Sequence, residues 1–236
     1  TSGAVVENKI LTTDALVLSA GTMNTTRLLM KAAAKDLISD LPDGVGRGWG
    51  SNADRIYLWT NLEEEFGAVQ GGPVVYGSKN WDDPNSAYTV VQASIPGFYG
   101  IDMRSTVLVG YGVSAGRGHF VYDAARDDAV LRWPHEGDSV LQTSHIDPTV
   151  RRIAGERSIL TDTNSIVPST WHPLGGASMG TVCDLEGRVF GQRGLYVLDG
   201  ALMPGNTAAC NPSMTIAAVV ERALDDIVVR DVGTVF

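Results

Sequence analysis

The N-terminal part of the chain combines a strand-like pattern with a helical one. Short apolar stretches at 4–7 and 10–13 have a β-like character, and the run over 15–21 is apolar almost throughout and ends in small residues. A run of this kind is typical of a strand buried on both faces. The apolar residues of 22–34 recur with helical spacing, so we expect a strand, a turn at Gly21 and a helix, which together form an α/β unit.

The middle of the chain has a different pattern. From about residue 41 to 133, short alternating segments are separated by glycine-containing turns, which indicates a largely antiparallel sheet. The expected strands are 55–61, 88–94, 105–112 and 119–123. Residues 138–156 are expected to be helical, with Pro148 interrupting the helix or opening a second segment.

The C-terminal part returns to a strand followed by a helix. After an irregular stretch that begins at Ser158, an apolar run at 195–198 predicts a buried strand, and 212–229 predicts a helix. The whole pattern therefore predicts an α/β (α+β) protein in which two strand–helix pieces flank a β-rich insert.

Composition and charge narrow the function classes. Apolar residues make up 44% of the chain, which is ample for a packed core, and 18 basic against 27 acidic residues give a net charge of −9. No basic run is present that would neutralise a row of phosphates, so nucleic acid is not expected as a partner. No apolar run approaches the roughly 20 residues of a membrane span, and neither cysteines nor histidines have the spacing of a metal site.

The pair Asn211-Pro212 marks a helix start. Asparagine is among the best N-cap residues, and proline fits the first helical position because it has no amide hydrogen to leave unpaired. The free amides of such a helix end stabilise negative charge by roughly 0.3–1 kcal/mol. The same pair also caps ordinary surface helices. Asp199-Gly200 after the expected strand favours a ligand site, because open α/β sheets bind ligands at that edge.

His172 lies in a stiff stretch, the Trp-His-Pro-Leu-Gly-Gly motif at 171–176. Proline and glycine fix the backbone more tightly than ordinary loop residues do, and imidazole suits proton transfer near neutral pH. A histidine in apolar surroundings is also commonly structural, and that alternative stays open. The other histidines, His119, His135 and His145, lack this framing and are expected to be surface or structural residues.

Several motifs occur in a recognisable order. They are Gly-Trp-Gly-Ser-Asn at 48–52, Gly-His-Phe-Val-Tyr-Asp-Ala at 118–124, the histidine motif at 171–176 and Gly-Leu-Tyr-Val-Leu-Asp-Gly at 194–200. Together they resemble the glucose-methanol-choline (GMC) oxidoreductase family, and within it the bacterial sterol oxidases. Residues 171–229 resemble the family's C-terminal signature, and 16–29 resemble the strand, turn and helix that close its FAD domain.

The resemblance implies a two-domain flavoenzyme with FAD as the cofactor. A Rossmann-like FAD-binding domain, represented by its C-terminal part only, would carry an inserted, mostly antiparallel substrate domain. The implied division is 1–45 and 161–236 for the FAD-binding part and 46–160 for the substrate domain. The implied reaction removes a hydride from a secondary alcohol of a bulky, sterol-like substrate to flavin N5, with O2 reduced to H2O2.

The resemblance also assigns site residues. His172 matches the active-site histidine, which positions the alcohol and serves as hydrogen-bond partner or base, and Asn211 matches the asparagine near the flavin and the substrate oxygen. Flavin contacts are expected from Gly21, Asp199, Gly200, Asn211, Pro212, Ser213 and Met214.

Two residues depart from the sterol-oxidase pattern. Those enzymes also isomerise a steroid double bond with a glutamate on a substrate-domain strand, and the strand at 88–94 puts Gln92 at that place. An amide cannot take a proton from carbon at neutral pH, so isomerase activity is expected to be weak or absent. Ser213 stands where the sterol oxidases usually have an aromatic residue, which indicates a different substrate shape or oxygen route.

The Gly-rich dinucleotide fingerprint is a third departure. The glycines at 44–48 follow no convincing strand and lack the GxGxxG spacing. Because Thr1 is also not an initiating methionine, we expect a companion N-terminal polypeptide or fragment that carries GxGxxG and holds the ADP moiety. A secreted bacterial enzyme fits the resemblance, although the sequence itself sets no compartment.

Three alternatives remain at this point. Two share the fold: a dehydrogenase that passes electrons to an acceptor other than oxygen, and a hydroxynitrile lyase, in which the flavin does no redox work. The third is a non-catalytic binding module, for which Gln92 and Ser213 would be signs of decay.

Overall fold

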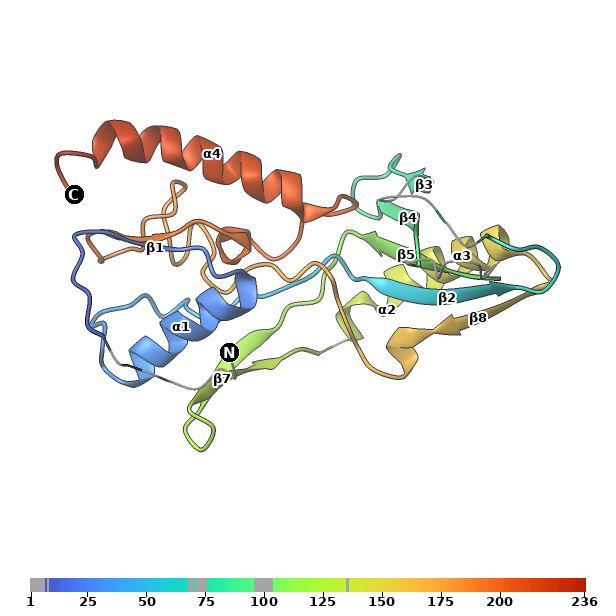
Figure 1. Cartoon of the computed structure of the whole chain (residues 1–236), viewed down its shortest axis with the longest axis horizontal. Helices are drawn as coiled ribbons and strands as arrows, with labels where there is room; N and C mark the ends of the chain where they lie inside the picture. The colour runs from blue at the N-terminus through green and yellow to red at the C-terminus, as the bar shows by residue number, and fades with distance from the viewer. Residues whose placement is uncertain (1–6, 8, 68–69, 71–75, 96–103, 135) are drawn as a thin grey trace.

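The computed structural model describes residues 7, 9–67, 70, 76–95, 104–134 and 136–236. Its elements gather at the two ends of an elongated molecule (Figure 1). One end holds strands β1 (Leu16–Leu18) and β9 (Leu195–Val197) with helices α1 (Thr22–Ala34) and α4 (Pro212–Arg230). The other end holds an antiparallel sheet together with helices α2 (Ser139–Leu141) and α3 (Asp147–Ala154).

The expected strand, turn and helix are present in the N-terminal part. β1 pairs in parallel with β9, and α1 begins directly after Gly21, whose φ is 82°. One expectation is corrected: Leu16 and Val17 are 48% and 50% exposed, because β9 is the one described strand that pairs with β1 and it occupies a single edge. The segment 10–13 forms no strand, and of 4–7 all but Glu7 lies outside the described residues.

Five strands form an antiparallel sheet, as the alternating segments predicted, but the expected strand 119–123 lies outside it. In order across the sheet they are β3 (Gly77–Asn80), β4 (Tyr88–Ala93), β5 (Ser105–Gly112), β2 (Arg55–Asn61) and β8 (Ser158–Asp162). The two edge strands, β3 and β8, were not expected. All four residues of β3 are exposed, so it has no apolar pattern of its own and is defined by its pairing with β4.

The two faces of this sheet pack against different partners. On one face, side chains of the sheet meet the helical segment; this cluster contains Tyr57, Tyr88, Val90, Leu108, Leu141, Ile146 and Val150. On the other face lies a cluster of Ile56, Val91, Val109 and Tyr111. Side chains alternate between faces along a strand, so these two clusters tell on which side of the sheet each neighbouring residue lies.

The helical segment around Pro148 is continuous but irregular. α2 passes into a π-helical stretch at Gln142–Ile146, and α3 follows directly with Pro148 as its second residue. Proline has no N–H to donate to the preceding turn, and the wider π turn accommodates the missing bond. Of the two outcomes expected for Pro148, the structure shows the second, because Pro148 lies in the first turn of the separate helix α3.

A two-stranded hairpin lies between the two ends. β6 (His119–Asp123) pairs with β7 (Asp128–Arg132), and the hairpin packs on α1, where Arg27 Nε donates to the carbonyl oxygen of Ala129 at 3.3 Å. A small core of Trp49, Phe120 and Ala129 closes this junction. The division of the chain at 45 and 160 stays a prediction.

Candidate active site

The loop that carries His172 is fixed by its backbone. Leu174 exchanges two hydrogen bonds with Gly50, at 2.9 and 3.0 Å. Gly175 has a φ of +80°, and a Cβ there would lie 2.5 Å from the carbonyl oxygen of Gly48. Only glycine fits this position, so the loop has the rigidity that its glycine and proline content indicated.

Asp54 orients the His172 ring. The histidine side chain is 9% exposed and the aspartate side chain 0%, and Nδ1 lies 2.7 Å from Asp54 Oδ1. The other carboxylate oxygen, Oδ2, accepts from the N–H groups of Trp171 and His172, at 2.8 and 3.2 Å, and from the Thr170 hydroxyl. An ionised carboxylate can only accept, so it places the proton on Nδ1 and leaves Nε2 as an acceptor.

Tyr111 packs against the same histidine. Its ring meets the His172 ring edge to face, with centroids 5.1 Å apart and an interplanar angle of 83°. Tyr111 comes from β5 and lies on the sheet face of Val91. Burial raises the pKa of Tyr111, so its hydroxyl stays protonated at neutral pH.

Asn211 reaches the same region from α4. It occupies the N-cap position, but its side chain makes no hydrogen bond to the helix and is exposed. Asn211 lines a cavity of about 460 Å³ together with Tyr111 and Thr89. Tyr111 both lines this cavity and contacts His172, so it links the region of Asn211 to that of His172, and a shared site of the two residues stays a prediction.

Asn52 connects the two halves of this site. Its side chain is fully buried, donates to the Cys210 carbonyl oxygen at 2.8 Å and accepts from the Thr207 N–H at 2.8 Å. Asn52 and Asp54 both lie just before β2. This short segment therefore positions both parts of the site. Asn52 holds the chain just before Asn211, and Asp54 holds His172.

Asp199 bonds within the protein itself. Its Oδ2 accepts from the Gly21 N–H at 3.0 Å and from the Thr25 hydroxyl, and its Oδ1 accepts a backbone N–H two residues on at 2.8 Å. A Cβ at Gly200 would lie 2.4 Å from Thr22 Oγ1, so glycine is needed there for packing. These residues tie β9 to the start of α1, and a direct flavin contact from them stays a prediction.

The first turn of α4 is open to a ligand. Pro212 is buried, whereas Ser213 and Met214 are exposed, Met214 by 82%. The N–H groups of Ser213 and Met214 belong to the first helical turn and find no acceptor among the described residues. They lie directly beside the exposed Asn211 amide.

The structure does not bring Gln92 together with His172 and Asn211, contrary to the expectation from the sequence. Gln92 follows Val91 on β4 and therefore lies on the opposite face, where its Nε2 donates to Thr106 Oγ1 at 3.1 Å. The sheet separates it from Tyr111 and His172. The identity of residue 92 therefore gives no indication of whether the protein isomerises a steroid double bond.

Asp54, Asn52 and Tyr111 are site residues that the sequence did not predict. A signal was available for Asn52, which ends one of the motifs that carried the family resemblance. Within the described ranges, no group of three or more His, Cys, Asp or Glu side chains is arranged to hold a metal ion. The same residues include no helix with the length and apolar character of a membrane span.

Two cholesterol oxidases share a stretch of similar sequence with this chain. The protein from Acinetobacter baumannii is 41% identical over 63 residues, which are 25% of this chain and 11% of that protein. The protein from Mycobacterium tuberculosis is 47% identical over 62 residues, which are 24% of this chain and 11% of that protein. The similarity thus spans a small part of each relative.

A solved structure extends the likeness to most of the chain. Pyridoxine 4-oxidase from Mesorbium loti superposes with a TM-score of 0.58 and 17% identity, over 90% of this chain and 51% of that one. At this identity the likeness concerns the fold, and the chain spans about half the length of that protein. Residues 124–219 match the GMC oxidoreductase family model. Over these residues, the chain is therefore similar in sequence to members of the GMC oxidoreductase family.

Proposed function

We propose that this chain supplies the substrate-binding sheet and the polar active-site residues of an FAD-dependent oxidase of secondary alcohols. The observation that carries the proposal is the buried Asp54–His172 pair beside a cavity lined by Asn211. The cholesterol oxidases among the relatives support a bulky, sterol-like alcohol as the substrate, with O2 reduced to H2O2.

The residues at the start of α4 fit a flavin ring. Free N–H groups of Ser213 and Met214, the Asn211 amide and the positive end of the helix dipole favour a ligand that gains negative charge. A flavin gains such charge at its N1 and C2 carbonyl. At Gly21, another expected flavin contact, a Cβ would have no atom within 4 Å, so the turn after β1 leaves room. FAD, when bound, supplies the hydride acceptor.

The side chains of this chain handle the alcohol. His172 Nε2 takes the hydroxyl proton, while Asp54 holds Nδ1–H and stabilises the positive charge that the ring gains. Asn211 donates to the alcohol oxygen and sets the direction in which its carbon faces. Loss of the proton raises electron density on the oxygen, so the hydride leaves the adjacent carbon more easily and a ketone forms. Tyr111 shields one side of the imidazole from water.

We also infer a companion polypeptide or fragment that carries GxGxxG and the remaining FAD contacts. Parallel strands are normally buried on both faces, yet Leu16 and Val17 of β1 are about half exposed, at 48% and 50%. On α4, Val228 and Val229 are 61% and 81% exposed. Intact-mass measurement of the purified protein tests this inference. Finding this chain by itself, folded and without flavin, would contradict it.

An absorbance spectrum followed by anaerobic titration with alcohols tests the reaction. Flavin bands that bleach with a hydroxysteroid, and H2O2 that appears under air, are the expected results. Bleaching without H2O2 indicates a dehydrogenase, and cyanohydrin cleavage without bleaching indicates a hydroxynitrile lyase.

The variant His172→Ala separates an enzyme from a binding module. In an enzyme of the proposed kind, turnover falls by orders of magnitude while flavin binding is retained. A protein that shows no turnover before or after the change is a binding module.

A further inference from the structure

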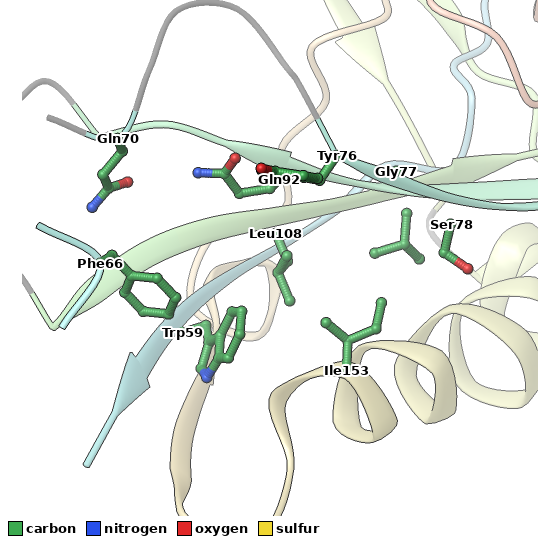
Figure 2. A pocket seen from close by; sticks show the side chains of 10 residues that line it. Trp59, Phe66, Gln70, Tyr76, Gly77, Ser78, Gln92, Leu108 and Ile153 are labelled. Atoms are coloured by element: carbon green, nitrogen blue, oxygen red, sulfur yellow. The ribbon is translucent and has the colours of Figure 1, made fainter. Parts of the chain in front are cut away.

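A second cavity lies on the face of the antiparallel sheet that is turned away from His172. Its volume is about 520 Å³, within the range of roughly 300–1,000 Å³ that small-molecule sites have. Figure 2 shows side chains from β2, β5 and α3 and from the neighbouring segments turned toward one space. Val90 and Leu108, which line it, belong to the same sheet face as the helix-covered cluster.

The walls of this cavity are aromatic and aliphatic. Trp59 and Phe66 meet edge to face, with ring centroids 4.7 Å apart. Trp59 Nε1 donates to Ser158 Oγ at 2.8 Å, so the indole already satisfies its polar atom and presents an apolar ring to the cavity. Leu108 from β5 and Ile153 from α3, which is 40% exposed at the rim, complete an apolar lining (Figure 2).

Among the polar side chains that line the cavity, which also include Ser78 and Tyr76, Gln92 is the one that lies on the central part of the sheet and has unused hydrogen-bonding capacity. Gln92 donates to Thr106 Oγ1 at 3.1 Å, and that hydroxyl donates to Gln70 Oε1 at 2.8 Å. Gln70 also donates to the Ser105 carbonyl oxygen at 2.5 Å. The carbonyl oxygen and second N–H of the Gln92 amide find no partner among the described residues. None of the described lining residues carries a formal charge at neutral pH, which favours a neutral ligand.

We propose that this cavity binds a neutral, mainly apolar ring compound that carries a hydroxyl or carbonyl group. Its rings lie against Trp59 and Phe66, and its oxygen exchanges a hydrogen bond with Gln92. The sheet stands between Gln92 and His172, although both cavities touch Tyr76 and Gly77 at the β3 edge. A molecule held by Trp59, Phe66 and Gln92 is therefore not placed for oxidation, and the site is an accessory one. The proposal is independent of the reaction proposed above.

Equilibrium dialysis of the complete, flavin-loaded protein against radiolabelled androst-4-ene-3,17-dione tests the proposal. This four-ring diketone is neutral and has no alcohol to oxidise. Ile153→Trp fills the cavity from its rim and is expected to abolish binding there. Val140→Trp is the matched control, because Val140 is an exposed apolar residue of α2 (69%) that does not line the cavity, and it is expected to bind the diketone like the wild type.

A second variant tests the polar contact without filling the cavity, so the result does not depend on Ile153→Trp alone. Gln92→Leu preserves the approximate size of the side chain and removes its polar atoms, so affinity is expected to fall about tenfold. Thermal unfolding checks that each variant is folded. The proposal is overturned if the wild type does not bind the diketone, or if Ile153→Trp and Gln92→Leu both bind it with wild-type affinity.

Discussion

Replacement of Asp54 by asparagine should reverse the hydrogen-bonding role of His172. Three donors, two N–H groups and the Thr170 hydroxyl, converge on Asp54 Oδ2, so an asparagine places its carbonyl oxygen there. Its NH2 group then faces His172 Nδ1, which lies 2.7 Å from the present Oδ1. Because NH2 donates, Nδ1 must accept and the neutral ring carries its proton on Nε2. That nitrogen can no longer take the proton of an alcohol.

The expected loss of rate follows from the loss of a general base. Such a base contributes about 10²–10⁴-fold, which corresponds to about 2.7–5.4 kcal/mol at 1.36 kcal/mol per factor of ten. The structural cost is smaller, because the donors to Oδ2 keep an acceptor and one charge-assisted bond becomes a neutral one. We expect a destabilisation of about 1–2 kcal/mol and a fall in Tm of about 2–8 °C for a chain of this size.

Stopped-flow measurement of flavin absorbance, without oxygen and with saturating alcohol, gives the rate of hydride transfer directly. Asp138→Asn is the matched control. Asp138 is 4% exposed and accepts hydrogen bonds from Ser114 Oγ and from the N–H groups of Ala115 and Gly116, but it has no contact with His172. The control should lose stability and keep its rate. If folded, flavin-loaded Asp54→Asn reduces its flavin within about threefold of the wild-type rate, the tautomer argument is refuted.

Three further predictions concern other parts of the chain. Burial raises the pKa of the Cys183 thiol to about 12, whereas Cys210 is exposed, so maleimide at neutral pH should add to one thiol of the native protein and to both after denaturation. Intact mass counts the adducts, and two on the native protein would contradict the burial of Cys183. Gly176→Ala should lower the free energy of unfolding by about 1–3 kcal/mol in urea titration, because Gly176 has a φ of +102° and a Cβ there would lie 2.4 Å from a threonine hydroxyl on α1; an unchanged midpoint would speak against that clash. Hydrogen bonds from Arg188 lower the pKa of Asp231 from 3.8, so its ionised form stabilises the fold above that pH and the contribution disappears as the pH falls through the lowered value. Asp231→Asn should therefore lower Tm at neutral pH, and the difference from the wild type should shrink in acid; a difference that stays constant would refute the linkage.

The elements that sequence predicted are those with a pattern of their own. β2, β5 and α1 have the expected bounds, because their apolar residues repeat with a strand or helix period. β3 reads Gly-Ser-Lys-Asn and is extended through its pairing with β4, so no local signal marks it. The exposure of β1 also escaped prediction, because burial of a strand depends on neighbours that its own sequence does not describe.

The site divides in the same way. Proline and glycine beside His172 and Asn211 marked both residues, because these neighbours restrict the backbone locally. Asp54 has no such neighbours. Its role depends on a hydrogen bond to a histidine 118 positions away, which only the fold brings close. The expected position of Gln92 beside His172 differs from the observed one for a geometric reason. Along a strand, a shift of one residue moves a side chain to the other face of the sheet. The order of motifs along the chain does not say on which face of β4 a given side chain lies.

The open edge of β1 also has a consequence for solubility. A strand with unpaired N–H and C=O groups on one side will pair with any extended segment that reaches it, including the same strand of another copy. Leu16 and Val17 add apolar surface at that edge. The edge that we propose receives the companion polypeptide is thus also where copies of this chain would aggregate. A companion that covers this edge would therefore also keep copies of this chain from associating through it.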